Sequence, residues 1–133
     1  MNEEGKTPPK TVPSAQGPAV APAGDGRISI EDFKRLQLRV GVIVEAIDHP
    51  NADRLFVVKV DLGEPQPRQL VAGIKGAYQA SELVGKRVVV VANMQPAMLR
   101  GVESQGMILA ASDATQLALV TPEKAIQVGG TVK

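Results

Sequence analysis

The chain has no cysteine and no tryptophan, and its 133 residues include one histidine, one tyrosine and two phenylalanines. Without cysteine it can form neither a disulfide nor a thiolate metal site, and it has no thiol nucleophile. Aromatic side chains are too few for a surface that stacks a series of unpaired bases. No apolar run approaches the length of a transmembrane helix. We therefore expect a cytoplasmic protein without cofactor, metal or membrane contacts.

Net charge is also small. Two of the 15 basic and three of the 14 acidic residues lie in the first 26 residues, so 13 basic and 11 acidic residues remain, a net charge of about +2. A strongly basic nucleic-acid-binding domain has a pI above about 9, whereas this sequence has a pI of about 8.0. Any binding of RNA must therefore depend on where individual charges lie.

The first 26 residues differ in composition from the rest. Five of the ten prolines fall there among Ala, Gly and Ser, with no Leu, Ile or Phe. Such a segment cannot bury enough apolar surface to offset its ordering entropy. It has neither a signal-peptide nor a transit-peptide pattern. We predict a disordered Pro/Ala-rich linker at 1–26 and a domain at 27–133, and a remnant left by cloning or truncation is the alternative to a natural linker.

The domain begins with a helix signal and a strand signal. Ser29 and Asp32 have the spacing of a capping box, which predicts a helix of one or two turns. From Leu36 to Ala46 the apolar residues recur with a period of two, which predicts a strand with one buried face. Gly41 within this strand predicts a bulge or sharp bend.

Four further strand-like runs follow at 56–62, 69–74, 88–92 and 107–111. A short helical run at 77–84 separates the third strand from the fourth, and two brief strands at 117–120 and 131–132 come last. This order predicts an all-β, five-stranded OB-fold barrel with a short N-terminal helix, an inter-strand cap helix and a C-terminal strand extension.

Two polar loops stand out in this plan. The first is IDHPNADRL, residues 47–55, between the first and second strands. The second is ANMQPAMLRGVESQGM, residues 92–107, between the fourth and fifth strands. An OB barrel binds oligonucleotides and oligosaccharides with these two loops. The most distinctive residues therefore fall where this fold binds its ligands.

Four stretches, HPNADRL, KVDLG, VGKRVVVVAN and LRGVESQGMILAA, resemble the tRNA-binding domain appended to methionyl-tRNA synthetases of bacterial type. The same domain exists as a stand-alone tRNA-binding protein. The resemblance covers Ile28 to Lys133. It implies a non-catalytic module that binds tRNA, and it implies a homodimer through the C-terminal strands. From the residues alone, packing of those strands onto their own barrel is the alternative.

In the first loop, His49 precedes Pro50, and we expect it to shape the loop, because one imidazole without a cluster of further ligands is not a metal site. Asn51 is a candidate RNA contact, although Asn and Asp side chains commonly stabilise turns; for Asp53 the turn role is the better prediction. Arg54 is long and permanently charged, and we expect it to contact phosphate.

In the second loop, Arg100 is the leading candidate. Its guanidinium can stack on a base or bind a phosphate, and an ion pair with Glu103 is the alternative. Relatives often carry Pro-Arg-Lys before this arginine, whereas this chain has Pro96-Ala97-Met98. Each lost phosphate contact weakens binding and flattens its salt dependence. The resemblance therefore implies a weaker affinity for tRNA here.

Four more residues of this loop are candidate RNA contacts: Asn93, Ser104, Gln105 and Met107. Asn93 can read a base edge or cap a turn. Ser104 and Gln105 offer a hydroxyl and an amide beside Gly106, which leaves room for a nucleotide. Met107 can fill the barrel end or support a base with its thioether.

Lys59 and Lys75 lie on or near the second and third strands, on the face that an OB-fold ligand crosses. Each can equally be a solvated surface lysine. The main rival to tRNA binding is a homodimerisation or protein-interaction module with vestigial RNA binding. An enzyme has little support, because the sequence shows no nucleophile constellation, phosphate-binding glycine motif or metal cluster.

Overall fold

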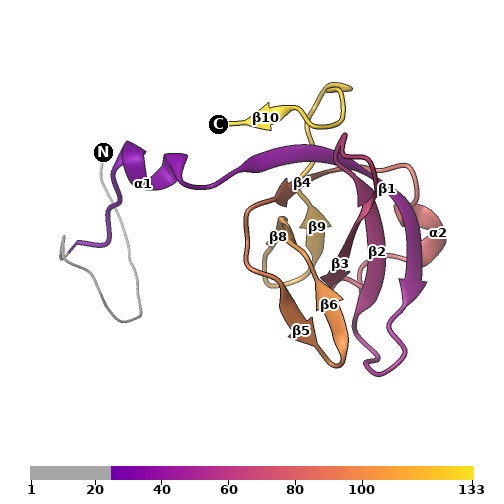
Figure 1. Cartoon of the computed structure of the whole chain (residues 1–133). Helices are drawn as coiled ribbons and strands as arrows, with labels where there is room; N and C mark the ends of the chain where they lie inside the picture. The colour runs from indigo at the N-terminus through magenta and orange to yellow at the C-terminus, as the bar shows by residue number, and fades with distance from the viewer. Residues whose placement is uncertain (1–24) are drawn as a thin grey trace. The chain divides into compact units, whose positions relative to one another are not determined.

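A short helix, α1 (Ile30–Lys34), lies near the start of the described part of the chain, residues 25–133 of a computed structural model (Figure 1). The hydroxyl of Ser29 accepts a hydrogen bond from the backbone N–H of Asp32 at 3.1 Å, as the capping signal predicts. Residues Lys34–Lys133 form a compact unit of their own. The linker predicted at 1–26 falls almost wholly outside the described residues.

Five antiparallel strands build the barrel: β1 (Leu38–Asp48), β2 (Phe56–Asp61), β3 (Arg68–Ala72), β4 (Arg87–Val91) and β7 (Met107–Ile108). Their order is β3-β2-β1-β4-β7. Between the two outer strands, the backbone N–H of Gln105 donates to the carbonyl oxygen of Gln69 at 2.8 Å. The barrel is thus nearly closed, and the predicted OB fold is confirmed.

Alternating residues of these strands fill the barrel. The core consists of buried aliphatic side chains and one aromatic, among them Ile43, Phe56, Val58, Val60, Leu70, Leu83, Val88 and Val90. In the second strand Phe56, Val58 and Val60 belong to this core cluster, whereas Val57 and Lys59 between them do not. A period of two in the sequence therefore located this core correctly.

The first strand departs from the predicted alternation. It begins two residues later than expected, and Leu36 is exposed. Ile43 is fully buried in the core on the face of Gly41, whereas Val40 is buried on the opposite face, so both faces of this half of the strand are covered. The pairing of β1 with β2 then shifts between Ile43 and Glu45, and Val44 at the shift is 45% exposed. A one-residue bulge turns every later side chain to the opposite face. The bulge predicted at Gly41 therefore lies further along the strand.

Gly41 itself agrees with the second predicted alternative, a sharp bend. A Cβ atom at this position would lie 2.5 Å from Cγ1 of Val60 and 2.7 Å from Cδ2 of Leu62. The adjacent strand is so close that no side chain fits between them. Glycine here permits the tight curvature that a small barrel needs.

The helix between β3 and β4 is shorter than predicted. It spans α2 (Ala80–Leu83), and Leu83 is buried in the barrel core. Gln79 and Glu82 form a capping box at its start. Gly85 ends the turn with a φ of 92°, and its N–H donates to the carbonyl oxygen of Ile43 at 2.7 Å. This bond fixes the helix against β1.

The second loop contains a hairpin that the sequence did not predict. Its strands are β5 (Ala97–Leu99) and β6 (Val102–Ser104), joined by the two-residue turn Arg100-Gly101. Both turn residues have positive φ, 54° and 88°. This is the signature of a type I′ turn, which usually carries Asn-Gly. Arginine at its first central position hides the signal in the sequence.

The C-terminal strands pair within the chain. The strand predicted at 107–111 is split, so that β7 pairs with β4 while β8 (Ala110–Ser112) pairs with β9 (Leu117–Leu119). The last strand, β10 (Thr131–Val132), pairs with Leu38 and Arg39 at the start of β1. The backbone groups of these C-terminal strands therefore form part of their hydrogen bonds within the same molecule.

Candidate nucleic-acid interface

Hydrogen bonds join the two predicted ligand loops. His49 is buried, its Nδ1 accepts from the backbone N–H of Asn51 at 2.9 Å, and its Nε2 lies 2.9 Å from the carbonyl oxygen of Leu99. Because Nδ1 accepts, Nε2 carries the proton and donates to Leu99. The single histidine thus holds the first loop to the β5–β6 hairpin, in line with its expected structural role.

Asn51 reinforces this connection. Its Nδ2 donates to the carbonyl oxygen of Arg100 at 3.2 Å. Arg100 therefore lies at the tip of the hairpin. The hydrogen bond from Asn51 fixes its backbone, while its side chain is exposed. The contact gives Asn51 a positioning role, and it leaves the amide oxygen of Asn51 available at the surface.

Arg54 and Arg100 border one cleft, although they lie 46 positions apart in the sequence. This cleft, called the loop cleft below, encloses about 470 Å³ and is lined by residues 51–55 and Arg100. Both arginines are exposed. Within residues 25–133, the alternative ion pair between Arg100 and Glu103 is not formed. Two guanidinium groups are therefore available to a ligand at this cleft.

The hairpin is also tied to β3. The Nε2 of Gln69 donates to the carbonyl oxygen of Glu103 at 2.8 Å. Ser104 is buried; its Oγ accepts from the backbone N–H of Val71 at 3.0 Å and donates to the carbonyl oxygen of Gly106 at 3.0 Å. The predicted RNA-contacting hydroxyl of Ser104 is thus engaged inside the protein, where it fixes the hairpin to the barrel wall.

Arg68 is a central residue that the sequence analysis did not identify. Its guanidinium donates to the carbonyl oxygens of Ala92 and Gln105 and forms a 2.6 Å ion pair with Glu64. These bonds join the β2–β3 turn, the end of β4 and the end of the second loop. Its strand position gave no sign of this role, because the partner carbonyls are 24 and 37 residues away.

Asn93 also acts within the protein. Its Oδ1 accepts from the backbone N–H of Gln37 at 2.9 Å, and its Nδ2 donates to the carbonyl oxygen of Arg35 at 2.6 Å. The side chain thus pins the segment before β1 to the exit of β4. This geometry matches the capping alternative for Asn93 rather than base recognition.

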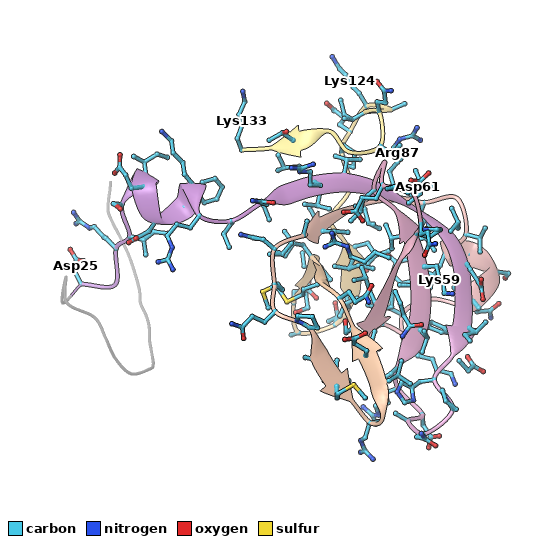
Figure 2. The ribbon with its side chains drawn as sticks, in the orientation of Figure 1. Asp25, Lys59, Asp61, Arg87, Lys124 and Lys133 are labelled. Atoms are coloured by element: carbon cyan, nitrogen blue, oxygen red, sulfur yellow. The ribbon has the colours of Figure 1, made fainter. Side chains whose placement is uncertain are left out.

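The remaining candidates have free surface. Met107 is 45% exposed on β7. The Nε2 of Gln105 donates a hydrogen bond to Oε1 of Glu103 at 3.2 Å, in an exposed position. Lys75 pairs with Asp48 at 3.4 Å, outside the loop cleft. Lys59 lies on the barrel wall, whereas Lys124 lies at the end of the barrel opposite the β5–β6 hairpin (Figure 2).

The described region shows neither a metal-binding cluster nor a membrane-spanning helix. Across residues 25–133, no three His, Asp or Glu side chains are grouped in a way that could hold a metal ion. No helix in the same range is long and apolar enough to cross a membrane.

Comparison with known proteins supplies the family. A family model described as "Putative tRNA binding domain" matches residues 38–131. A methionine–tRNA ligase from Thermococcus kodakarensis is 55% identical over 106 residues, which make up 80% of this chain and 14% of that ligase. The chain therefore spans only a small part of the length of this relative.

Solved structures agree with the family match. The MetRS related protein from Pyrococcus horikoshii is 30% identical, with a TM-score of 0.74 over 80% of this chain and 98% of that one. The chaperone CsaA from Bacillus anthracis is 27% identical, with a TM-score of 0.73 over 81% of this chain and 100% of that one. Since the family match spans most of the chain and includes both joined loops, the chain belongs to the tRNA-binding domain family.

Proposed function

We propose that this chain is a non-catalytic module that holds tRNA by its folded shape, with the RNA backbone at the loop cleft. The observation that carries this proposal is that Arg54 and Arg100 border one cleft whose walls are joined by His49. A guanidinium fork matches the geometry of a phosphate. Structured RNA is recognised largely through phosphates, 2′-hydroxyls and shape, which suits a surface with few aromatic side chains.

The candidate residues divide into two groups. Direct contacts to RNA are assigned to residues with free surface: Arg54, Lys59, Lys75, Arg100, Gln105 and Met107. The other three candidates form side-chain hydrogen bonds with the protein backbone and position the loops: Asn51, Asn93 and Ser104. This division follows from how much hydrogen-bonding capacity each group retains.

We further infer that the chain is the C-terminal part of a methionyl-tRNA synthetase of the cytoplasm. The identity with the Thermococcus ligase supports this, since the match occupies a small share of a longer enzyme. A tethered module of this kind raises the effective concentration of tRNA at the active site of the enzyme. It needs no chemistry of its own.

The test is a gel-shift titration of the 133-residue chain with deacylated tRNA over a series of salt concentrations. We expect binding that weakens linearly on a log–log plot as salt rises. A single-stranded oligonucleotide of matched length should compete poorly. Equal competition by that oligonucleotide would contradict recognition by folded shape.

A second candidate function is a protein-interaction or homodimerisation module. Three methionines of the second loop, Met94, Met98 and Met107, are 45%, 66% and 45% exposed, and flexible thioethers suit adaptable binding surfaces. In the C-terminal extension, Val120 and Ile126 are also exposed. We expect light scattering at micromolar concentration to show a homodimer that forms through the C-terminal strands. A clean monomer of 14.0 kDa would contradict it.

A further inference from the structure

A second cleft adjoins the loop cleft, and Arg54 lines both. This second cleft, called the turn cleft below, encloses about 580 Å³. Its other walls are the segment 73–77 after β3 and the turn 112–117 between β8 and β9. The two clefts therefore share the Arg54 side chain in their linings. A polynucleotide with a phosphate at Arg54 can place its neighbouring nucleotides on either side.

One wall of the turn cleft carries a carboxylate with a fixed orientation. Oδ1 of Asp113 accepts hydrogen bonds from the backbone N–H groups of Thr115 and Gln116 and from the Thr115 hydroxyl, at 2.8 to 3.0 Å. These bonds hold the pKa of Asp113 below its usual value, so the group is ionised at neutral pH. Among residues 25–133, no donor reaches its Oδ2.

The facing wall is open and partly apolar. Gly73 and Gly76 add no side chains to it, and a Cβ at Gly76 would meet no atom within 4 Å. Ile74 is buried beneath this wall, and Leu117 is half-buried beside it. A planar ring can therefore lie in the cleft with its polar edge toward Asp113.

We propose that the turn cleft receives one unpaired nucleotide of the bound RNA, with its phosphate at Arg54 and the amino edge of its base at Asp113. The inference rests on the proposed function. The volume of the turn cleft falls in the range of small-ligand sites, roughly 300–1,000 Å³. A cleft of this size admits one nucleotide but no base-paired helix. Unpaired loops and ends are also where proteins read RNA sequence.

The charges of the turn cleft determine how the nucleotide is oriented and which base is preferred. A carboxylate repels phosphate, so the phosphate lies on the Arg54 side and the base on the Asp113 side. Asp accepts a hydrogen bond from an exocyclic amino group such as N4 of cytosine. Uracil has no such group, and its one donor on that edge, N3–H, lies between two carbonyl oxygens, which a carboxylate repels. The cleft therefore favours cytosine over uracil.

The test uses the 133-residue chain with fluorescein-labelled hexacytidylate and hexauridylate, beside a tRNA transcript. We expect the wild-type chain to bind hexacytidylate about tenfold more tightly than hexauridylate, as one base contact allows. Asp113→Asn keeps an Oδ1 acceptor and so keeps the turn, but it replaces the free oxygen with a donor. The preference should then fall to within about twofold.

A matched control separates this contact from bulk charge. Glu123→Gln also removes one negative charge from an exposed turn, and general electrostatics predicts slightly tighter RNA binding for both variants. The proposal predicts the opposite sign for Asp113→Asn with hexacytidylate. If Asp113→Asn tightens that binding as Glu123→Gln does, the contact does not exist.

A blocking variant covers the case in which Asp113→Asn disturbs the fold. Gly76→Leu places a side chain in open space and should remove the preference without lowering the melting temperature. Equal binding of the two oligonucleotides by the wild-type chain, or no measurable binding of either, with tRNA still bound, would overturn the nucleotide site alone. If the wild-type chain fails to bind tRNA at all, the proposed function is wrong as well, and the two failures are distinguished.

Discussion

His49 and Leu99, fifty residues apart, are joined by a hydrogen bond of 2.9 Å between Nε2 and a backbone carbonyl oxygen. The bond lies in a buried position, because His49 is only 5% exposed. Two loops that carry the candidate RNA contacts therefore form one surface. The tRNA-binding proposal depends on this connection as much as on the arginines themselves.

His49→Ala should disconnect the loops. Removing the imidazole leaves the carbonyl of Leu99 and the N–H of Asn51 without their partner, which should lower the free energy of unfolding by about 1–3 kcal/mol. We also expect weaker tRNA binding, since Arg54 and Arg100 are no longer held in one arrangement. Urea unfolding and gel-shift titration measure the two effects. Unchanged affinity in a destabilised variant would show that the connection does not serve binding.

Gly41→Ala should destabilise the barrel without affecting the RNA surface. The added methyl group would meet Val60 at 2.5 Å and Leu62 at 2.7 Å, and overpacking of this kind costs typically about 1–3 kcal/mol. Its unfolding midpoint in urea should fall while tRNA affinity of the folded protein stays at the wild-type value. Gly41→Ala is thus the control for His49→Ala. If Gly41→Ala also lost tRNA affinity, the weaker binding of His49→Ala could be a result of lower stability alone.

The sequence predicted the barrel better than the site. Alternation located the β2 core because each of those residues keeps its face along the strand. It failed at Ile43 because both faces of the first half of β1 are buried, and at Val44 because a bulge there leaves no mark in the apolar pattern. The β5–β6 hairpin was missed because Arg100 holds a turn position that Asn usually takes.

The site prediction was limited in a different way. Loop Asn and Ser side chains bind either a ligand or protein backbone, and their composition is the same in both cases. Asn93 and Ser104 hydrogen-bond to backbone groups 56 and 33 residues away, which no local pattern reveals. Arg68 was overlooked for the same reason. By contrast, Arg54 and Arg100 were predicted from charge and loop position, and the structure places them on one cleft.

Adding charge to the hairpin should strengthen binding. Ala97 and Met98 are exposed on β5, next to Arg100. Ala97→Arg combined with Met98→Lys adds two positive charges beside Arg100. Each new phosphate contact should raise the magnitude of the salt slope by about 0.7–0.9. Filter binding at several salt concentrations measures this slope, and a double variant with the wild-type slope would place the RNA elsewhere.

The salt dependence of tRNA binding by Arg100→Ala tests the central claim most directly. We expect a loss of roughly 1–2 kcal/mol in binding free energy and a salt slope smaller by about one unit. Arg100→Asn controls for the turn, because Asn favours the same positive φ, and it should lose affinity equally. Lys124→Ala, at the opposite end of the barrel, should bind as the wild type does. If Arg100→Ala keeps full affinity while Lys124→Ala loses it, the RNA binds the other end of the barrel and the loop cleft is not the site.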